Sequence, residues 1–401
     1  MELYKDIMEL YIHIPFCVKK CDYCDFLSGP FDADVRRLYT DALCKEIKWW
    51  GIRHSDKRIV SIYIGGGTPS WLEVEYMAKI MDTVHKYFRV DPQAEVTIEV
   101  NPGTVSSEHF NVYRSVGINR ISIGLQSANE DELRILGRVH TYDRFLHTFE
   151  FARVAGFSDV SVDIMTGLPG QTPAKLLNTI HQVTRLQPEH ISAYALIIEK
   201  GTPFYDRYKF DAVKQHAGME TEALPNEDQE YELYKTAQAE LVAHGYEQYE
   251  ISNYAKKGHV CQHNIGYWKR VPYLGMGIGA ASLVDERRFS NERDIHSYIA
   301  HSADLINENF KQASPMVNPD SVQELSRQSA MEEFMFLGLR MNAGISRNEF
   351  RQAFGIEIDG VYGAVIQKLR SEGLLEAAEG RIFLNDRGLD LSNYAMAQFL
   401  Q

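Results

Sequence analysis

The amino-acid sequence predicts an α/β fold built on a parallel β-sheet, because short runs rich in β-branched residues alternate with amphipathic helical segments through its first half. Polar or glycine-rich turns separate these segments, and cysteine, acidic and amide residues lie at or just after the ends of the runs. Chains that alternate in this way join parallel strands by right-handed crossovers. An open barrel and a doubly wound sheet both fit this pattern.

Six runs are expected to be strands, and they span residues 10–15, 59–64, 95–101, 120–126, 160–166 and 190–197. Helical patterns with one apolar face lie between them, for example at 35–50 and 71–88. The polar residues that could carry chemistry follow or end these strands. In a parallel barrel the carboxyl ends of the strands form the edge that holds the active site.

The second half of the chain predicts an extension and a separate C-terminal unit. A helix at 226–245 and a strand-like run at 246–255 extend the first part, and the polar segment 311–330 with its two prolines is typical of a linker. Three helices and a hairpin then follow in the order of a winged helix. We therefore divide the chain into a barrel (1–225), its extension (226–310), a linker (311–330) and a winged-helix-like domain (331–401).

Composition excludes several classes of function. The formal net charge is −13, and residues 330–401 hold 7 Lys or Arg against 10 Asp or Glu, which is unfavourable for binding nucleic acid. No run of 18 apolar residues and no signal-like start occur, so we expect a cytoplasmic chain without a membrane anchor.

Three of the five cysteines follow the first predicted strand as Cys17-x3-Cys21-x2-Cys24. Three thiolates on one short loop suit a [4Fe–4S] cluster that leaves one iron open. Structural zinc is the alternative, but it needs a fourth Cys or His at close range, and His13 and Cys44 have no familiar zinc spacing. The motif therefore predicts an iron–sulfur cluster.

Seven ordered motifs carry a family resemblance over nearly the whole chain. They read YIHIPFCVKKCDYCDF, YIGGGTPS, EVNPGT, IGLQS, LGRVH, DIMTGLPGQT and CQHNIGYW. This series resembles the oxygen-independent coproporphyrinogen oxidases and the related HemW-type heme chaperones of the radical S-adenosylmethionine (SAM) family. The resemblance implies a partial (β/α)6 radical SAM barrel, a [4Fe–4S] cluster and SAM bound at its open iron.

The resemblance also assigns residues to SAM. They are Tyr11, Gly66, Gly67, Thr68, Glu99, Gln126, Arg138, Asp163 and Tyr194. Carboxylates can accept from an ammonium or a ribose, and Arg can bind a carboxylate. Several of these assignments have a plainer alternative: a tight turn for the glycines, a buried ion pair for Asp163, and core packing for the two tyrosines.

Two functions remain open at this stage, a heme chaperone and a coproporphyrinogen oxidase, with another tetrapyrrole-modifying reaction as a third. The oxidases of this family carry a further Cys where this chain has Phe26. The sequence His263-Asn264-x-x-Tyr267-Trp268 resembles the heme-binding motif of the chaperones.

On the chaperone interpretation His263 is the candidate axial ligand of heme, with Cys261 as an alternative. Related chaperones carry His where this chain has Ala281, a departure that concerns only the heme site. The implied partners are heme and heme-accepting apo-proteins, membrane-bound respiratory enzymes among them. No catalytic residue is assigned.

Overall fold

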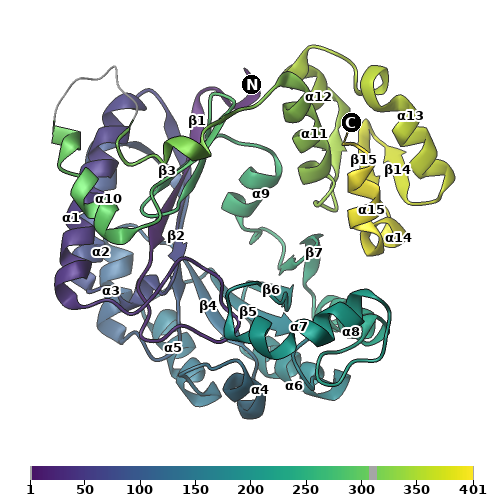
Figure 1. The fold of residues 1–401 in the computed structure, drawn as a ribbon, viewed down its shortest axis with the longest axis horizontal. Coiled ribbons are helices and arrows are strands. Elements are labelled where there is room, and N and C mark those ends of the chain that lie inside the picture. Colours follow the sequence, from purple (N-terminus) through teal and green to yellow (C-terminus); the bar gives the residue numbers. More distant parts are fainter. Residues whose placement is uncertain (1, 307–313, 401) are drawn as a thin grey trace.

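The structure, a computed structural model, describes residues 2–306 and 314–400 (Figure 1). Twelve of the described strands form one curved sheet in the order β12-β11-β10-β9-β1-β2-β3-β4-β5-β6-β8-β7. The six central strands are β1 (Ile7–Ile14), β2 (Arg58–Gly66), β3 (Arg89–Val100), β4 (Arg120–Gln126), β5 (Val160–Thr166) and β6 (His190–Ala195). They are the six strands expected from the sequence.

Strands β1 to β6 pair in parallel, each beside its neighbour in sequence. The connecting helices are α1 (Ala33–Arg53), η2 (Pro69–Trp71), α2 (Val74–Tyr87), α3 (Ser107–Ser115), α4 (Glu130–Ile135), α5 (Tyr142–Val154) and α6 (Pro173–Thr184). Figure 1 shows helices α1 to α6 along the outside of the curved sheet. The prediction of an α/β fold is confirmed, and the sheet takes the open-barrel form because its helices cover one face.

The two faces of the central strands differ in chemistry because successive side chains in a strand point to opposite sides. Apolar side chains on the outer face pack into the main hydrophobic core beneath the helices, and they include Leu10, Ile62, Ile98, Ile123 and Ile164. Strand register places a polar row on the inner face. Its members are Glu9, Tyr11, His13, Ser61, Tyr63, Glu95, Thr97, Glu99, Arg120, Ser122, Ser161, Asp163, His190, Ser192 and Tyr194.

The sheet is extended at both edges. Antiparallel strands β8 (Asn253–Ala255) and β7 (Glu247–Glu250) follow β6, after helices α7 (Pro203–His216) and α8 (Glu227–Ala243). Strand β9 (Tyr273–Met276) pairs with β1, and β10 (Ala281–Val284), β11 (Arg287–Ser290) and β12 (Gln323–Glu324) follow antiparallel. Helix α9 (Gln262–Trp268) lies within the curve of the sheet (Figure 1).

A buried carboxylate joins the extension to helix α1. Glu46 accepts hydrogen bonds from the backbone N–H of Gly277 (2.9 Å), from Asn291 Nδ2 (2.7 Å) and from the hydroxyl of Tyr298. Tyr298 lies on α10 (Ile295–His301), and burial raises the pKa of Glu46 to about 7. One side chain thus connects α1 to the residue after β9 and to α10.

The C-terminal unit has a second hydrophobic core, which includes Phe334, Phe350, Tyr362 and Ile382. Its elements are α11 (Arg327–Gly338), β13 (Ile345–Ser346), α12 (Arg347–Phe354), α13 (Ile358–Ser371), β14 (Leu375–Ala378), β15 (Arg381–Leu384), α14 (Asp386–Asp390) and α15 (Ser392–Ala397). The three expected helices and the hairpin are present, followed by two short helices that sequence patterns did not predict. The winged-helix comparison stays a prediction.

The segment interpreted as a linker is partly structured. Residues 311–313 lie outside the described residues, whereas 3-10 helix η4 (Pro319–Ser321), strand β12 and the start of α11 fall within 311–330. Two further 3-10 turns, η1 (Glu2–Tyr4) and η3 (Asp304–Ile306), complete the elements of the described chain. None of its helices has the length and apolar character that crossing a bilayer requires.

Candidate functional site

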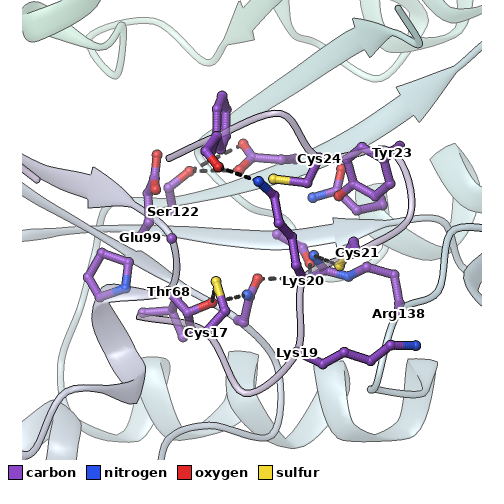
Figure 2. A pocket seen from close by; sticks show the side chains of 18 residues that line it. Cys17, Lys19, Lys20, Cys21, Tyr23, Cys24, Thr68, Glu99, Ser122 and Arg138 are labelled. Carbon is purple, nitrogen blue, oxygen red and sulfur yellow. Dashed lines mark hydrogen bonds between the residues drawn. The ribbon is translucent and has the colours of Figure 1, made fainter. Parts of the chain in front are cut away.

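The loop between β1 and α1 places its three cysteines around one cavity at the carboxyl ends of the strands (Figure 2). Cys17 is buried, Cys21 and Cys24 are half-buried, and all three thiols are free. The loop is held by backbone hydrogen bonds from Cys17 to Gly29 (3.0 Å) and from Cys24 to Cys21 (3.2 Å). Burial raises the pKa of the Cys24 thiol to about 11. A positively charged metal centre would favour its thiolate.

The residues that line this cavity include no His and no fourth Cys. The two residues that a zinc site would have used are engaged elsewhere. His13 Nε2 is hydrogen-bonded to the carbonyl of Leu27 (2.8 Å), and the thiol of Cys44 lies 3.9 Å from the carbonyl of Lys79 on α2. The donor set therefore fits a cluster held by three thiolates better than tetrahedral zinc.

A chain of hydrogen bonds connects two of the cysteines across the cavity floor. Thr68 Oγ1 lies 3.6 Å from Cys17 Sγ and accepts from Asn101 Nδ2 (2.7 Å). Asn101 Oδ1 accepts from Arg138 Nη2 (2.8 Å), and Arg138 Nη1 lies 3.7 Å from Cys21 Sγ. Residues from the cysteine loop, the glycine turn, β3 and the α4–α5 connection are thereby fixed relative to one another.

The glycine turn after β2 packs tightly against the start of the cysteine loop. The backbone N–H groups of Gly67 and Thr68 donate to the carbonyls of Ile14 (2.9 Å) and Phe16 (2.8 Å). A Cβ at Gly67 would lie 2.9 Å from the Phe16 carbonyl oxygen, and Gly66 has φ +116° with the His13 ring against it. Both positions therefore require glycine. Gly67 and Thr68 line the cavity, whereas Gly66 is not among its lining residues.

Two carboxylates from the inner row face the same cavity. Glu99 accepts from the hydroxyl of Tyr63 (3.1 Å) and from the backbone N–H of Gly66 (3.0 Å). Burial, reinforced by the negative charge of Asp163, raises the pKa of Glu99 to about 7. Asp163 accepts from Ser122 Oγ (3.2 Å), and burial raises its pKa as well. A cationic ligand in the cavity would stabilise both carboxylates.

Gln126 also lines the cavity, and its backbone is in the left-handed region with φ +75°. The register of β4 against β5 shifts between Gly124 and Gln126, which marks an irregularity at the end of β4. Such conformations persist where surrounding contacts enforce them, and they concentrate at binding sites. The structure thus brings together in one cavity the three cysteines and most residues assigned to SAM: Gly67, Thr68, Glu99, Gln126, Arg138 and Asp163.

Tyr11 and Tyr194 do not line this cavity. Tyr11 lies deeper inside the barrel, where its hydroxyl is 3.0 Å from His13 Nδ1 and its ring stacks on Tyr63. Tyr194 is the penultimate residue of β6, lies on its inner face and is 40% exposed. Asn101 and Ser122 also line the cavity. Asn101 ends the third predicted strand and is expected at this edge of the barrel but is not assigned to SAM, whereas Ser122 is not singled out from the sequence.

His263 lies at the opposite, amino end of the barrel and is only 1% exposed. The sequence pattern suggests a loop around His263, but the residue lies in helix α9. Glu95 stabilises the start of this helix, because it accepts from the first free N–H groups, those of Gln262 (3.0 Å) and His263 (3.1 Å). Gly266 of the same helix packs on Glu9 so closely that a Cβ would overlap the carboxylate. Helix α9 thus closes the amino end of the barrel, and we call it the plug.

Both ring nitrogens of His263 are engaged. Nδ1 lies 2.8 Å from Ser61 Oγ, and Nε2 lies 3.0 Å from the hydroxyl of Tyr267. Because Ser61 donates to Glu9 (3.0 Å), it accepts from Nδ1, which leaves Nε2 to accept from Tyr267. Burial lowers the pKa of His263 to about 3, so the ring is neutral. Cys261 is buried as well, with its thiol 3.4 Å from Glu95 Oε1.

A second cavity opens beside α9. It is lined by Tyr11, Tyr267, Trp268, Arg270, Tyr273, Ala281, Leu283, Arg288 and Leu337. Aromatic rings dominate it, and both guanidinium groups are paired with carboxylates: Arg270 with Glu286 (2.8 Å) and Glu333 (3.0 Å), and Arg288 with Glu333 (2.8 Å). The Tyr-Trp pair of the His263 motif and the position Ala281 therefore meet at one cavity.

Comparisons with known proteins agree with this geometry. The family model of the radical SAM superfamily matches residues 11–183, and that of the HemN C-terminal domain matches residues 325–391. Heme chaperone HemW of Bacillus subtilis is 35% identical over 97% of this chain and 98% of its own length. Heme chaperone HemW of Lactococcus lactis is 31% identical over 97% and 96%.

A vertebrate relative and a solved structure extend the comparison. Radical S-adenosyl methionine domain-containing protein 1, a mitochondrial protein of Danio rerio, is 33% identical over 96% of this chain and 83% of its own. The solved structure of coproporphyrinogen III oxidase (HemN) from Escherichia coli aligns with a TM-score of 0.81 at 21% identity, covering 99% of this chain and 90% of that one. At this identity the likeness concerns the fold.

Proposed function

Because the chain belongs to the HemW family of the radical SAM superfamily, we propose that it binds heme and transfers it to acceptor proteins. The observation that carries the proposal is the similarity to HemW chaperones along almost the entire chain. The His263-Asn264-x-x-Tyr267-Trp268 segment, which resembles a heme-binding motif, supports it. Membership of the superfamily implies a [4Fe–4S] cluster and SAM. On this proposal the acceptors are heme-requiring apo-proteins such as membrane-bound respiratory enzymes, and the chain delivers heme to them from the cytoplasm.

Cys17, Cys21 and Cys24 are the residues that would hold the cluster. When bound, a cluster with one open iron supplies one-electron chemistry to the sulfonium group of SAM. The chain of Thr68, Asn101 and Arg138 keeps two of the thiols in place, and the guanidinium brings a positive charge next to Cys21. The protein's contribution is to position and shield this centre.

The polar groups around the cavity match the polar groups of SAM. In the part of the chain that the structure describes, Glu99 and Asp163 form no ion pair with a cationic side chain, and these carboxylates suit an ammonium, a sulfonium or ribose hydroxyls. Arg138 suits a carboxylate, and Gln126 offers an amide at the strand end. These assignments to individual atoms of SAM are part of the proposal.

For heme we propose the cavity beside α9, where Tyr267, Trp268 and Tyr273 offer aromatic faces to a porphyrin. His263 is the proposed axial ligand, with Cys261 as the alternative. Since Tyr267 occupies Nε2 of His263, binding to iron requires this hydrogen bond to open. Ala281 lines the same cavity, so a ligand contributed by His at that position in relatives is missing here.

The test uses anaerobically reconstituted protein with its cluster. Heme is titrated spectroscopically, and coproporphyrinogen III with SAM and reductant is assayed in parallel. We expect one heme per chain and no decarboxylation, with weaker binding in His263→Ala. His259→Ala is the matched control, because His259 lies in the same segment but contacts Asp159 (3.1 Å) outside the plug. Formation of a vinyl-bearing product without tight heme binding would identify an oxidase instead.

A further inference from the structure

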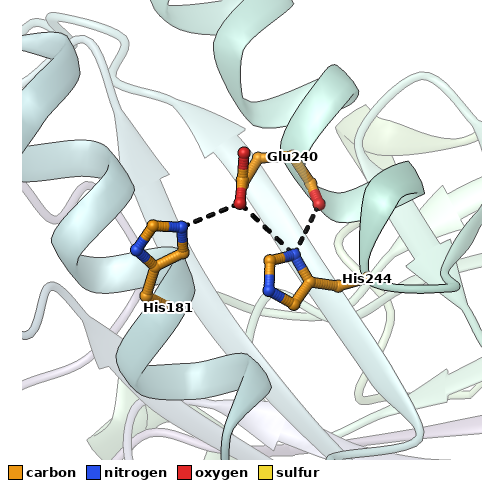
Figure 3. Close-up of side chains that lie close together, drawn as sticks. All are labelled: His181, Glu240 and His244. Atoms are coloured by element: carbon orange, nitrogen blue, oxygen red, sulfur yellow. Dashed lines mark hydrogen bonds and ion pairs between the residues drawn. The ribbon is translucent and has the colours of Figure 1, made fainter.

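Three potential metal ligands meet on the outer surface where helices α6 and α8 pack together (Figure 3). His181 lies in the last turn of α6, Glu240 lies in the last turn of α8, and His244 caps the C-terminus of α8. One ligand atom from each residue lies within 4.8 Å of the other two. None of the three lines either cavity described above.

We propose that His181, Glu240 and His244 bind one zinc ion. Two imidazoles and a carboxylate are a donor set that zinc uses in sites with three protein ligands, where water takes the fourth position. The side chains are 45%, 27% and 33% exposed, so an ion can enter and water can complete its coordination. This inference does not depend on the heme proposal.

The distances are close to those of a bound ion. Bonds of about 2.1 Å at the tetrahedral angle place two ligand atoms roughly 3.4 Å apart. His244 Nδ1 lies 3.4 Å from Glu240 Oε1, which already fits. His181 Nε2 lies 2.7 Å from the same oxygen as a hydrogen bond, so an ion would need this distance to lengthen by about 0.7 Å.

The ends of the helices favour a cation at this point. The C-terminus of a helix carries a partial negative charge from its free carbonyls, and two such ends converge on the triad. Neither Lys nor Arg occupies the last turn of α8. His244 Nδ1 also donates to the Glu240 carbonyl (2.9 Å), and coordination through this nitrogen would replace that bond. The ion would clamp α6 to α8 on the outside of the barrel.

The experiment measures zinc uptake by the cluster-loaded chain, in which iron already occupies Cys17, Cys21 and Cys24. Equilibrium dialysis against zinc chloride is followed by metal analysis, and thermal unfolding is recorded with and without zinc. We expect one zinc per chain and a higher unfolding temperature with zinc. The affinity should fall at least about tenfold in His181→Ala, in His244→Ala and in Glu240→Gln, because each loses a ligand.

The matched control is His147→Ala on α5, where His147 pairs with Asp143 (3.6 Å). Among the described residues no second His joins that pair within ligand distance. This variant should retain wild-type uptake. The unfolding temperature without zinc verifies that each variant folds. Equal zinc uptake by wild type and by the His181→Ala/His244→Ala double variant, or no uptake by wild type, would overturn the proposal.

Discussion

Arg138 Nη2 lies 2.8 Å from Asn101 Oδ1, and this hydrogen bond completes a chain of contacts from Cys17 to Cys21. The guanidinium is thereby held beside a thiol that we assign to the cluster. Because a fixed positive charge near a redox centre favours its reduced form, Arg138 should influence the reduction potential of the cluster.

We therefore expect Arg138→Met to shift the cluster potential to more negative values, on the order of 50–100 mV, since a nearby unit charge contributes about 1–3 kcal/mol. Anaerobic redox titration followed by electron paramagnetic resonance measures the shift. Arg134→Met is the control, because it changes the net charge by the same amount at an exposed arginine on neighbouring α4. Equal potentials in Arg138→Met and wild type would contradict this role.

Removal of the hydrogen bond from Tyr267 to His263 Nε2 is expected to strengthen heme binding. If Nε2 is the iron ligand, Tyr267→Phe frees its lone pair and should tighten heme binding about fivefold, the equivalent of one hydrogen bond of about 1 kcal/mol. Soret titration measures the affinity. Tyr273→Phe removes a hydroxyl from the same cavity without touching His263 and should have little effect. Weaker binding in Tyr267→Phe would argue against Nε2 as the ligand.

Gly266 should tolerate no side chain, because a Cβ there would overlap the Glu9 carboxylate inside the barrel. We expect Gly266→Ala to lower the free energy of unfolding by about 1–3 kcal/mol, as overpacking of a core does. Gly360→Ala is the matched control, because Gly360 is also a helical glycine but a Cβ there would meet no other side chain or backbone atom within 4 Å. The free energy of unfolding of this variant should rise by roughly 0.5–1 kcal/mol. Urea unfolding measures the free energy of unfolding of both variants. If both changed it equally, helix α9 would pack less tightly against Glu9 than the structure indicates.

Glu46 predicts a pH dependence of stability. Its pKa rises from the ordinary 4.5 to about 7 on folding, so the folded chain binds a proton that the unfolded chain has lost between these values. The free energy of unfolding should therefore fall as pH rises through this window, by about 3 kcal/mol in total, and change little above it.

Glu46→Gln cannot titrate and should remove this decline relative to wild type. Urea unfolding at several pH values between about 5 and 8 measures the difference. Glu75→Gln on α2 changes an exposed carboxylate and should leave the wild-type profile intact. An identical pH profile for Glu46→Gln and wild type would show that Glu46 is ionised throughout.

The sequence by itself determined the features that depend on neighbouring residues. The alternation of apolar runs with amphipathic segments located the six central strands, and the spacing of Cys17, Cys21 and Cys24 singled out the loop that we assign to the cluster. The positions that end strands brought Glu99, Gln126 and Asp163 into consideration. Such signals are local, because strand periodicity and ligand spacing are written within a few residues.

Only the tertiary structure decided which distant residues meet. Asn101 joins Thr68 to Arg138 because β3 lies between β2 and β4, a pairing that no local pattern contains. The same holds for helix α9, whose His263 reaches Ser61 across 202 positions of sequence and plugs the barrel. Contacts of this kind follow from strand order and from the closing of the curved sheet, and both depend on packing of the whole chain.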